Sequence, residues 1–259
     1  QDVAEAIGQQ YQTVPKSRIG AAVALADRLD SLVGLFAAGL APTGAKDPFG
    51  LRRAAIGIVQ PLLEHGISFD LREAVRKAAA LQPIEVNEEV QAQVLDFLEG
   101  RLSVLLKDAG YRYDVVDAIL AEQRNAADPA AATEAVRQLQ AWVKREDWQT
   151  ILPAFARCVR IIRSSGVDGS RLSVDPSQLI ETEEKKLHEA IRENLTGEPS
   201  SVDDVLNIVV KLIPSINAFF DEVLVMAEDE KVRRNRLALV GQIAGLSDGI
   251  ADFSRLEGF

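Results

Sequence analysis

The sequence predicts an all-α protein, and three observations support this fold class. Apolar residues recur at intervals of three and four along almost the whole chain, which is the spacing of one helix face. Segments that alternate apolar and polar residues with a period of two, as half-buried strands do, are scarce. Glycines directly follow several of the periodic segments, at the position where many helices end.

Composition limits the class of protein. The 259 residues are 47% apolar and 26% charged, enough to bury the core of one large domain or of two ordinary ones. The single cysteine, Cys158, excludes an internal disulfide and a cysteine-rich zinc module, and it fits the reducing cytoplasm, where we expect the protein to act. The net charge of −10 argues against a protein that coats nucleic acid non-specifically, and we expect no DNA partner.

The first four expected helices span residues 2–11, 17–39, 48–65 and 70–81. The acidic start of the chain is not a signal peptide, and the lack of an initiating Met leads us to expect a piece of a longer protein. The apolar stretch 19–40 is long enough to span a bilayer, but Asp27, Arg28 and Asp30 lie near its middle, where charges are costly in lipid. This stretch therefore predicts a buried helix of a soluble protein, without a membrane partner.

The third of these helices has the clearest boundary signals. Asp47 is placed to cap its start, and Pro48 then occupies the first helical position, where the missing N–H costs nothing. Pro61 is expected to kink the helix. Gly66 is expected to end it in the left-handed conformation.

Four helices are expected in the middle of the chain, over residues 87–109, 114–124, 130–145 and 148–165. Gly110 and Gly166 end the first and the last of them. The segment 126–132, which consists mainly of alanine, reads as a connector between neighbouring helices.

Three helices complete the chain, over residues 176–195, 202–226 and 229–254. Gly197 is expected to end the first, and Pro214 to break or restart the second. The loop 164–176 is rich in Ser, Gly and Asp, as ordered or mobile turns are. We expect the last domain boundary at this loop, with a single continuous helical body as the alternative.

The loop from Gly39 to Gly44 resembles a phosphate-binding loop at first sight. However, Ala45 occupies the place of the required lysine, and Lys46 comes one residue late. The loop also follows an expected helix, whereas a P-loop follows a strand. A connector between two helices is the simpler interpretation, and no nucleotide site is expected here.

Catalytic and metal sites find little support in the sequence. Asp27 resembles the terminal metal-binding aspartate of His-Asp (HD) phosphohydrolases, yet such a site needs several histidines, and this chain has only His65 and His188. We expect Asp27 to be a structural vestige that caps or pairs with a neighbouring arginine (Arg28 or Arg53), with no metal bound. Cys158 lies on an apolar helix without a histidine nearby, so a buried, inert thiol is expected. No catalytic residue is expected in this chain.

Clustered cations are better candidates for function. The clusters comprise Arg157, Arg160 and Arg163, spaced by three on one helix, then Arg233, Arg234 and Arg236, and finally Lys185 and Lys186. Arginine binds phosphates and base edges through a bidentate fork that lysine lacks. Acidic residues lie one turn from the last two clusters, and such mixed charges are commonly a solvated face. Charge alone does not separate these two interpretations.

Aromatic residues matter because unpaired bases are commonly held by stacking. Phe219 and Phe220 are expected in the core, after Pro214. Tyr111 and Tyr113 flank a basic residue after a helix end and are candidates for exposure. The two tryptophans are candidates for packing between helices: Trp142 and Trp148.

Three groups of residues resemble one known family. Residues 24–34 and 39–53 resemble the β subunit of the two-subunit bacterial glycyl-tRNA synthetase, and Gly110–Ala121 resembles a second signature of that subunit. Residues 183–187, 216–226 and 233–240 are similar to the helical anticodon-binding domain that the family shares with arginyl-tRNA synthetases. The chain departs from the family pattern at Arg160, where an asparagine is usual, and at Gly50 and Pro61, which are unusual inside a helix.

The resemblance implies a division of the chain and a role for each part. Residues 1–66 would be the C-terminal end of an HD-like helical domain, 67–165 a helical connecting region, and 166–259 a helical-bundle (DALR-type) anticodon-binding domain. The chain would be the C-terminal region of the β subunit of glycine–tRNA ligase, an aminoacyl-tRNA synthetase that assembles as a heterotetramer.

The resemblance also implies the partners. The chain would bind tRNA(Gly) and position it for ATP-dependent glycylation by the α subunit, which uses ATP and Mg²⁺, so no cofactor is expected in this chain. The tRNA-binding candidates are the eight cations named above. Two alternatives stay open: a structural region that holds the α–β assembly without reading tRNA, and an HD-type metal-dependent phosphohydrolase.

Overall fold

The structure of the protein is a computed structural model that describes residues 2–167 and 172–259. Over these residues the fold is all-α, as expected, and the one β-type pairing is an isolated bridge between Thr43 and Lys46. Contacts divide the chain into two compact units, residues 1–136 (unit 1) and 137–259 (unit 2). The three-part division expected from the resemblance places its boundaries elsewhere and stays a prediction. Within the described ranges, no helix has both the length and the apolarity needed to cross a membrane.

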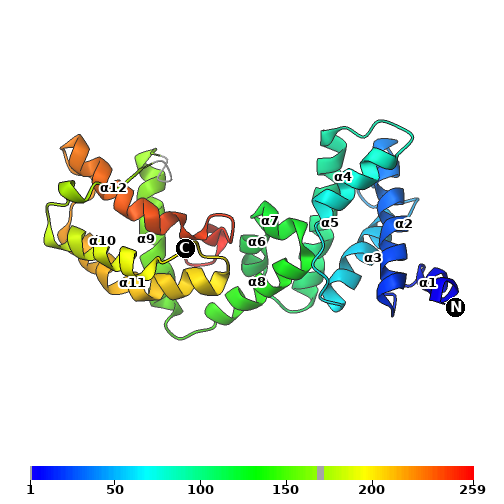
Figure 1. Cartoon of the computed structure of the whole chain (residues 1–259), viewed down its shortest axis with the longest axis horizontal. Coiled ribbons are helices and arrows are strands. Elements are labelled where there is room, and N and C mark those ends of the chain that lie inside the picture. Colours follow the sequence, from blue (N-terminus) through cyan, green and yellow to red (C-terminus); the bar gives the residue numbers. More distant parts are fainter. Residues whose placement is uncertain (1, 168–171) are drawn as a thin grey trace. The chain divides into compact units, whose positions relative to one another are not determined.

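Unit 1 is built from helices that pack around α2 and α5 (Figure 1). The helices are α1 (Asp2–Gln9), α2 (Arg18–Ala37), α3 (Leu51–Glu64), α4 (Leu71–Leu81), α5 (Glu88–Asp108), α6 (Tyr113–Leu120) and α7 (Gln123–Ala127), and the division between the units falls within α8 (Pro129–Trp142). The core is aliphatic: Leu32 and Val33 of α2, Ile58 and Leu62 of α3, and Leu98 of α5 are all fully buried. These residues follow the spacing of three and four that predicted the helices.

Helices α2 and α3 meet through an arginine that crosses a glycine. Arg28 of α2 donates to the backbone carbonyls of Gly57 (3.0 Å), Gln10 (3.1 Å) and Gln12 (2.6 Å). A Cβ atom added to Gly57 would lie 2.6 Å from the Arg28 Nε atom. Three hydrogen bonds hold the Arg28 guanidinium against α3. The guanidinium fits there because position 57 is a glycine and has no side chain.

Helix α3 begins three residues later than expected, at Leu51 instead of Pro48. The N-cap residue is Gly50, but the Asp47 carboxylate still caps the first turn, since it accepts from the Leu51 amide (2.8 Å) and from the Arg52 amide (2.9 Å). Gly50 precedes the helix with a φ of +69°, which explains a glycine that seemed unusual inside a helix. Pro61 lies within α3 without ending it.

Unit 2 is a helical bundle closed by short 3₁₀ turns (Figure 1). Its elements after α8 are α9 (Trp148–Ser165), η2 (Pro176–Gln178), α10 (Thr182–Asn194), α11 (Val202–Glu222), α12 (Glu230–Ala244), η3 (Gly245–Ser247) and η4 (Phe253–Arg255). Helix α9 packs against α11 and α12, and the Phe155 ring meets the Phe253 ring edge-on at 5.4 Å. Helix α9 has the bounds expected from the sequence. Residues 168–171 of the expected boundary loop lie outside the described residues.

Three expected helices of unit 2 differ in the structure. The expected helix 176–195 is a 3₁₀ turn followed by α10, because Glu181 and Glu184 form a capping box that starts a new helix at Thr182. The expected helix 229–254 ends at Ala244 and continues only as 3₁₀ turns. Pro214 does not break α11, in which Leu212 and Ile216 are buried on either side of it.

Glycines at helix ends follow the expectation in three cases of four. Gly66, Gly110 and Gly166 have positive φ angles, of 58°, 92° and 68°, as the left-handed position after a helix requires. Gly197 is not among the glycines with positive φ, and α10 ends earlier, with Leu195 as its C-cap.

Candidate functional site

Helix α9 presents a basic face in unit 2. Its sequence contains three arginines and no acidic residue, in a chain whose net charge is −10. The spacing of three places Arg157, Arg160 and Arg163 along one side of the helix. Their side chains reach solvent, while Phe155 and Cys158 point into the core.

Two of these arginines lie over aromatic rings. The Arg157 guanidinium carbon is 4.6 Å from the centroid of the Phe220 ring, and the Arg160 guanidinium carbon is 5.5 Å from that of Phe259. Phe219 is fully buried as expected, whereas Phe220 is partly exposed, so the expectation that both are core residues is wrong for Phe220.

The same arginines have acidic neighbours at their edges. Arg157 Nη2 lies 3.8 Å from Asp221 Oδ1, and Arg163 Nη2 lies 3.5 Å from Asp252 Oδ1. The pKa of Asp252 is lowered overall. Desolvation alone would raise this pKa, but the hydrogen bonds with Ser254 and the charge of Arg163 outweigh it. The α9 face therefore combines fixed cations, ring surfaces and a few carboxylates.

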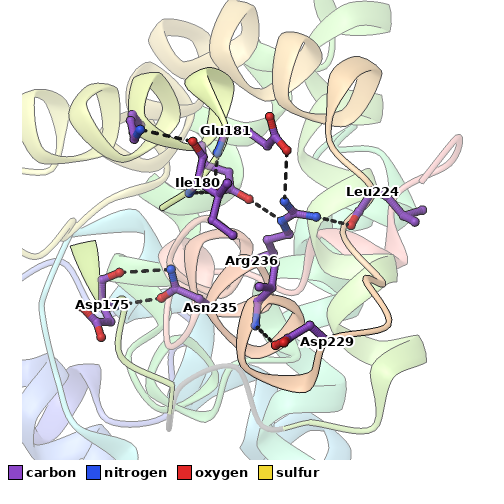
Figure 2. Close-up of polar contacts among 10 residues, drawn as sticks. Asp175, Ile180, Glu181, Leu224, Asp229, Asn235 and Arg236 are labelled. Atoms are coloured by element: carbon purple, nitrogen blue, oxygen red, sulfur yellow. Dashed lines mark hydrogen bonds and ion pairs between the residues drawn. The ribbon is translucent and has the colours of Figure 1, made fainter. Parts of the chain in front are cut away.

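Arg236 is an internal residue. Its side chain is 9% exposed, and its Nε atom pairs with a carboxylate oxygen of Glu184, whose side chain is 1% exposed. Arg236 Nη1 donates to the Leu224 carbonyl (2.9 Å), and Nη2 lies 3.9 Å from a Glu181 carboxylate oxygen (Figure 2). The other Glu184 oxygen accepts from the Ile180 amide (2.6 Å).

Arg236 thus fastens the start of α10 to the segment between α11 and α12. A guanidinium that already has these partners has little freedom to bind an external phosphate. The burial of Arg236 therefore does not favour its expected contact with tRNA.

The neighbouring Asn235 makes a second internal link. Its side-chain amide donates to the Asp175 carbonyl (3.1 Å), and its oxygen accepts from the Asp175 amide (2.7 Å), as Figure 2 shows. This pairing holds the turn η2 against α12. Sequence reasoning singled out the arginines around Asn235 but not this residue, although an uncharged polar side chain two positions before the apolar run Leu237–Val240 was the available signal.

The remaining candidate cations lie on α10 and α12, the helices that carry Glu184, Asn235 and Arg236. Arg233 donates to the Ala227 carbonyl (2.9 Å), and Lys185 donates to the Ile180 carbonyl (3.2 Å). Lys186 pairs with Glu183 at 2.8 Å. Arg234 is exposed, like both lysines. Among the described residues, no hydrogen bond or ion pair joins this group to the arginines of α9.

The other sequence candidates lack the surroundings of a reactive site. Burial raises the pKa of Cys158 to about 12, against the opposing charge of Arg157. The thiol is fully buried, as expected. Asp27 is exposed on α2. Burial lowers the pKa of the neighbouring Arg28, and the charge of Asp27 opposes this shift. No cap or ion pair of Asp27 is seen in the described parts of the chain. Over the same ranges, no three His, Cys, Asp or Glu side chains gather as a metal site would require.

Comparison with known proteins gives two family matches. The model of the glycyl-tRNA synthetase beta subunit matches residues 1–121, and the model of the DALR anticodon binding domain matches residues 151–249. The second match contains the three arginines of α9 and both internal links of unit 2.

Curated relatives agree with these matches. The chain is 38% identical to the glycine–tRNA ligase beta subunit of Myxococcus xanthus over 275 residues, which is 98% of this chain and 38% of that protein. It is 38% identical to the beta subunit of Moorella thermoacetica over 272 residues, with the same coverage. It is also 38% identical to the chloroplastic/mitochondrial glycine–tRNA ligase 2 of Arabidopsis thaliana over 250 residues, 95% of this chain and 23% of that protein.

The chain thus spans less than half the length of these relatives. Both of its units are nevertheless accounted for, since the first family model lies in unit 1 and the second in unit 2. The chain belongs to the glycyl-tRNA synthetase β-subunit family, and its second unit carries a DALR anticodon-binding domain.

Proposed function

We propose that this chain is the tRNA-binding part of a glycine–tRNA ligase β subunit, and that its second unit holds the anticodon arm of tRNA(Gly). The observation that carries this proposal is the α9 face, where three arginines and no acid lie on one helix inside a DALR domain. Arginine forks bind phosphate oxygens in pairs, and such contacts fix the register of an RNA on a protein.

The candidate cations divide into two roles under this proposal. Arg157, Arg160 and Arg163 contact the RNA, with Arg234 and the exposed lysines of α10 at the edge of the contact. Arg233 and Arg236 hold the backbone between α11 and α12 through its carbonyls. They position the surface instead of touching the RNA.

The chemistry of glycylation takes place elsewhere under this proposal. The α subunit activates glycine with ATP and Mg²⁺, and this chain contributes no reacting group and no cofactor. Its contribution is positioning: a tRNA held at its anticodon arm presents its acceptor end to the α subunit at a high effective concentration. The assembled enzyme is an α–β heterotetramer of the cytoplasm.

A charge-matched pair of variants tests the proposal. The R157A/R160A/R163A variant removes the α9 arginines, while R18A/R53A/R124A removes three exposed arginines of unit 1. Affinity of the chain for a tRNA(Gly) transcript is measured across a salt series. We expect binding that weakens with salt, and a log–log slope that falls by up to about 0.7 for each lost phosphate contact in an unpaired strand. The unit 1 variant is expected to keep the wild-type slope.

The assembled α–β enzyme gives a second readout. In the α9 variant, tRNA charging is expected to fall while glycine activation by ATP–pyrophosphate exchange stays unchanged. Equal affinity in both variants, or no salt-dependent binding by the wild-type chain, would favour the alternative in which this region only holds the α–β assembly.

A further inference from the structure

The two arginine–phenylalanine pairs of unit 2 share one helix face. Arg157 lies over Phe220 of α11, and Arg160 lies over Phe259. The two arginines are three positions apart, so their Cα atoms are about 4.5 Å apart along the helix axis. Two planar cations, each backed by a ring, therefore follow one another along α9.

A ring beneath a guanidinium changes what the arginine offers to a ligand. A surface arginine samples many rotamers, whereas a ring on one side attracts the cation and favours a flat orientation. At Arg157 an ion pair with Asp221 at 3.8 Å adds a fixed point at the edge of the group. The side chain of Arg157 is still 41% exposed, and Arg160 is exposed.

The ligand that fits such a surface is an unpaired nucleotide. Unstacked bases in RNA loops stack on aromatic rings and on arginine planes. Phosphate binding uses the charge and the bidentate fork of arginine, and it does not require a ring beneath the guanidinium. The rings under Arg157 and Arg160 thus have a purpose that phosphate binding alone does not explain.

We propose that unpaired bases of the anticodon loop stack on the guanidinium planes of Arg157 and Arg160, with Phe220 and Phe259 as positioning residues beneath them. This inference rests on the proposed function and deepens it, because it says how α9 holds the loop. Arg163, which pairs with Asp252 and has no ring contact among the described residues, contributes charge only.

Arginine-to-lysine substitution separates stacking from charge. The R157K and R160K variants, alone and together, keep the cation and lose the plane. Binding of the full chain to a stem-loop RNA with the glycine anticodon is expected to weaken about tenfold in each single variant, since one stacked base contributes on this scale, and further in the double variant. The salt slope is expected to stay unchanged. R163K is the matched control on the same helix face: it loses the bidentate fork but no ring-backed plane, so its affinity is expected to fall less than that of R157K or R160K.

A change in the RNA tests the same contact from the other side. Abasic nucleotides in the anticodon are expected to weaken wild-type binding about tenfold for each stacked base lost and to cause no further loss in the R157K/R160K variant. F220L and F259L remove the rings and keep both arginines, and they are expected to reproduce part of the lysine effect. Tryptophan fluorescence verifies that these variants fold.

The outcomes separate this inference from the proposed function. Lysine variants that bind as tightly as the wild type, or R163K losing as much as R157K, would overturn stacking and leave tRNA binding in place. Loss of α-subunit binding with unchanged RNA affinity would overturn it as well, since the face would then contact protein. A wild-type chain that binds no RNA would remove both proposals.

Discussion

At the scale of single residues, Arg236 places a positive charge in the interior of unit 2. Glu184 compensates this charge, and the remaining donors and acceptors of the pair are satisfied by the Leu224 carbonyl and the Ile180 amide. A buried ion pair of this kind is costly to break because one charge then stays in the interior without its partner.

Replacing Arg236 alone is therefore expected to destabilise unit 2 strongly. The R236M variant leaves the Glu184 carboxylate buried and unpaired, and we expect a loss of about 3–5 kcal/mol in the free energy of unfolding. Urea unfolding followed by tryptophan fluorescence measures it, since the two tryptophans of the chain, Trp142 and Trp148, both lie in unit 2.

A double variant serves as the control for this prediction. E184Q/R236M removes both charges and is expected to recover part of the lost stability. A loss below about 1 kcal/mol in R236M would match a surface ion pair and contradict the internal role.

Cys158 is expected to resist alkylation in the folded protein. Burial raises the pKa of its thiol to about 12, so the reactive thiolate is scarce at neutral and mildly alkaline pH, and the side chain is fully buried. Treatment with iodoacetamide followed by mass spectrometry is expected to show no adduct on the native chain and a full adduct in urea. Rapid modification of the native chain would show that α9 opens locally.

At the scale of elements, the start of α3 depends on Asp47. Desolvation would raise the pKa of Asp47, but hydrogen bonds from the Arg52 and Leu51 amides together lower it. A carboxylate with a lowered folded-state pKa stabilises the helix above its ordinary pKa, and this stabilisation is lost as the pH falls through the lowered value.

The D47A variant is expected to weaken the start of α3 by about 1 kcal/mol, the typical worth of a capping side chain. Hydrogen exchange of the segment 51–64 measures this change directly, because Leu51 and Arg52 donate to the cap. D47N is expected to keep most of the protection, since asparagine also caps, and to lose the acid-dependent part. Equal exchange in D47A and the wild type at neutral pH would contradict the role of the cap.

The sequence predicted most helices of this fold because helix periodicity is local. The bounds of α9 and the cap at Asp47 follow from neighbouring residues alone. The continuity of α11 through Pro214 does not, because it depends on Leu212 and Ile216 being buried by other elements.

The candidate site divides in the same way. The spacing of the α9 arginines was visible in the sequence, but the burial of Arg236 depends on Glu184, 52 positions earlier. The ring under Arg157 comes from α11, and no local pattern pairs these two residues.

At the scale of the whole molecule, the net charge of −10 restricts where RNA can bind. A chain that repels polyanions on average binds them only where cations gather, as on the α9 face. We therefore expect an unrelated double-stranded DNA, even in large excess, to compete poorly with tRNA(Gly) at physiological salt. Fluorescence anisotropy with labelled tRNA measures this competition. Effective competition by DNA would indicate non-specific electrostatic binding instead.

The crossing of Arg28 over Gly57 in unit 1 has a consequence for how this sequence can change over generations. Alanine at position 57 is the better helix former, yet its methyl group would collide with the guanidinium. A side chain at position 57 is therefore expected only together with a change at position 28: either the Arg28 guanidinium moves and loses its backbone hydrogen bonds, or a shorter residue replaces it. A lineage that keeps the arginine and its hydrogen bonds is expected to keep the glycine.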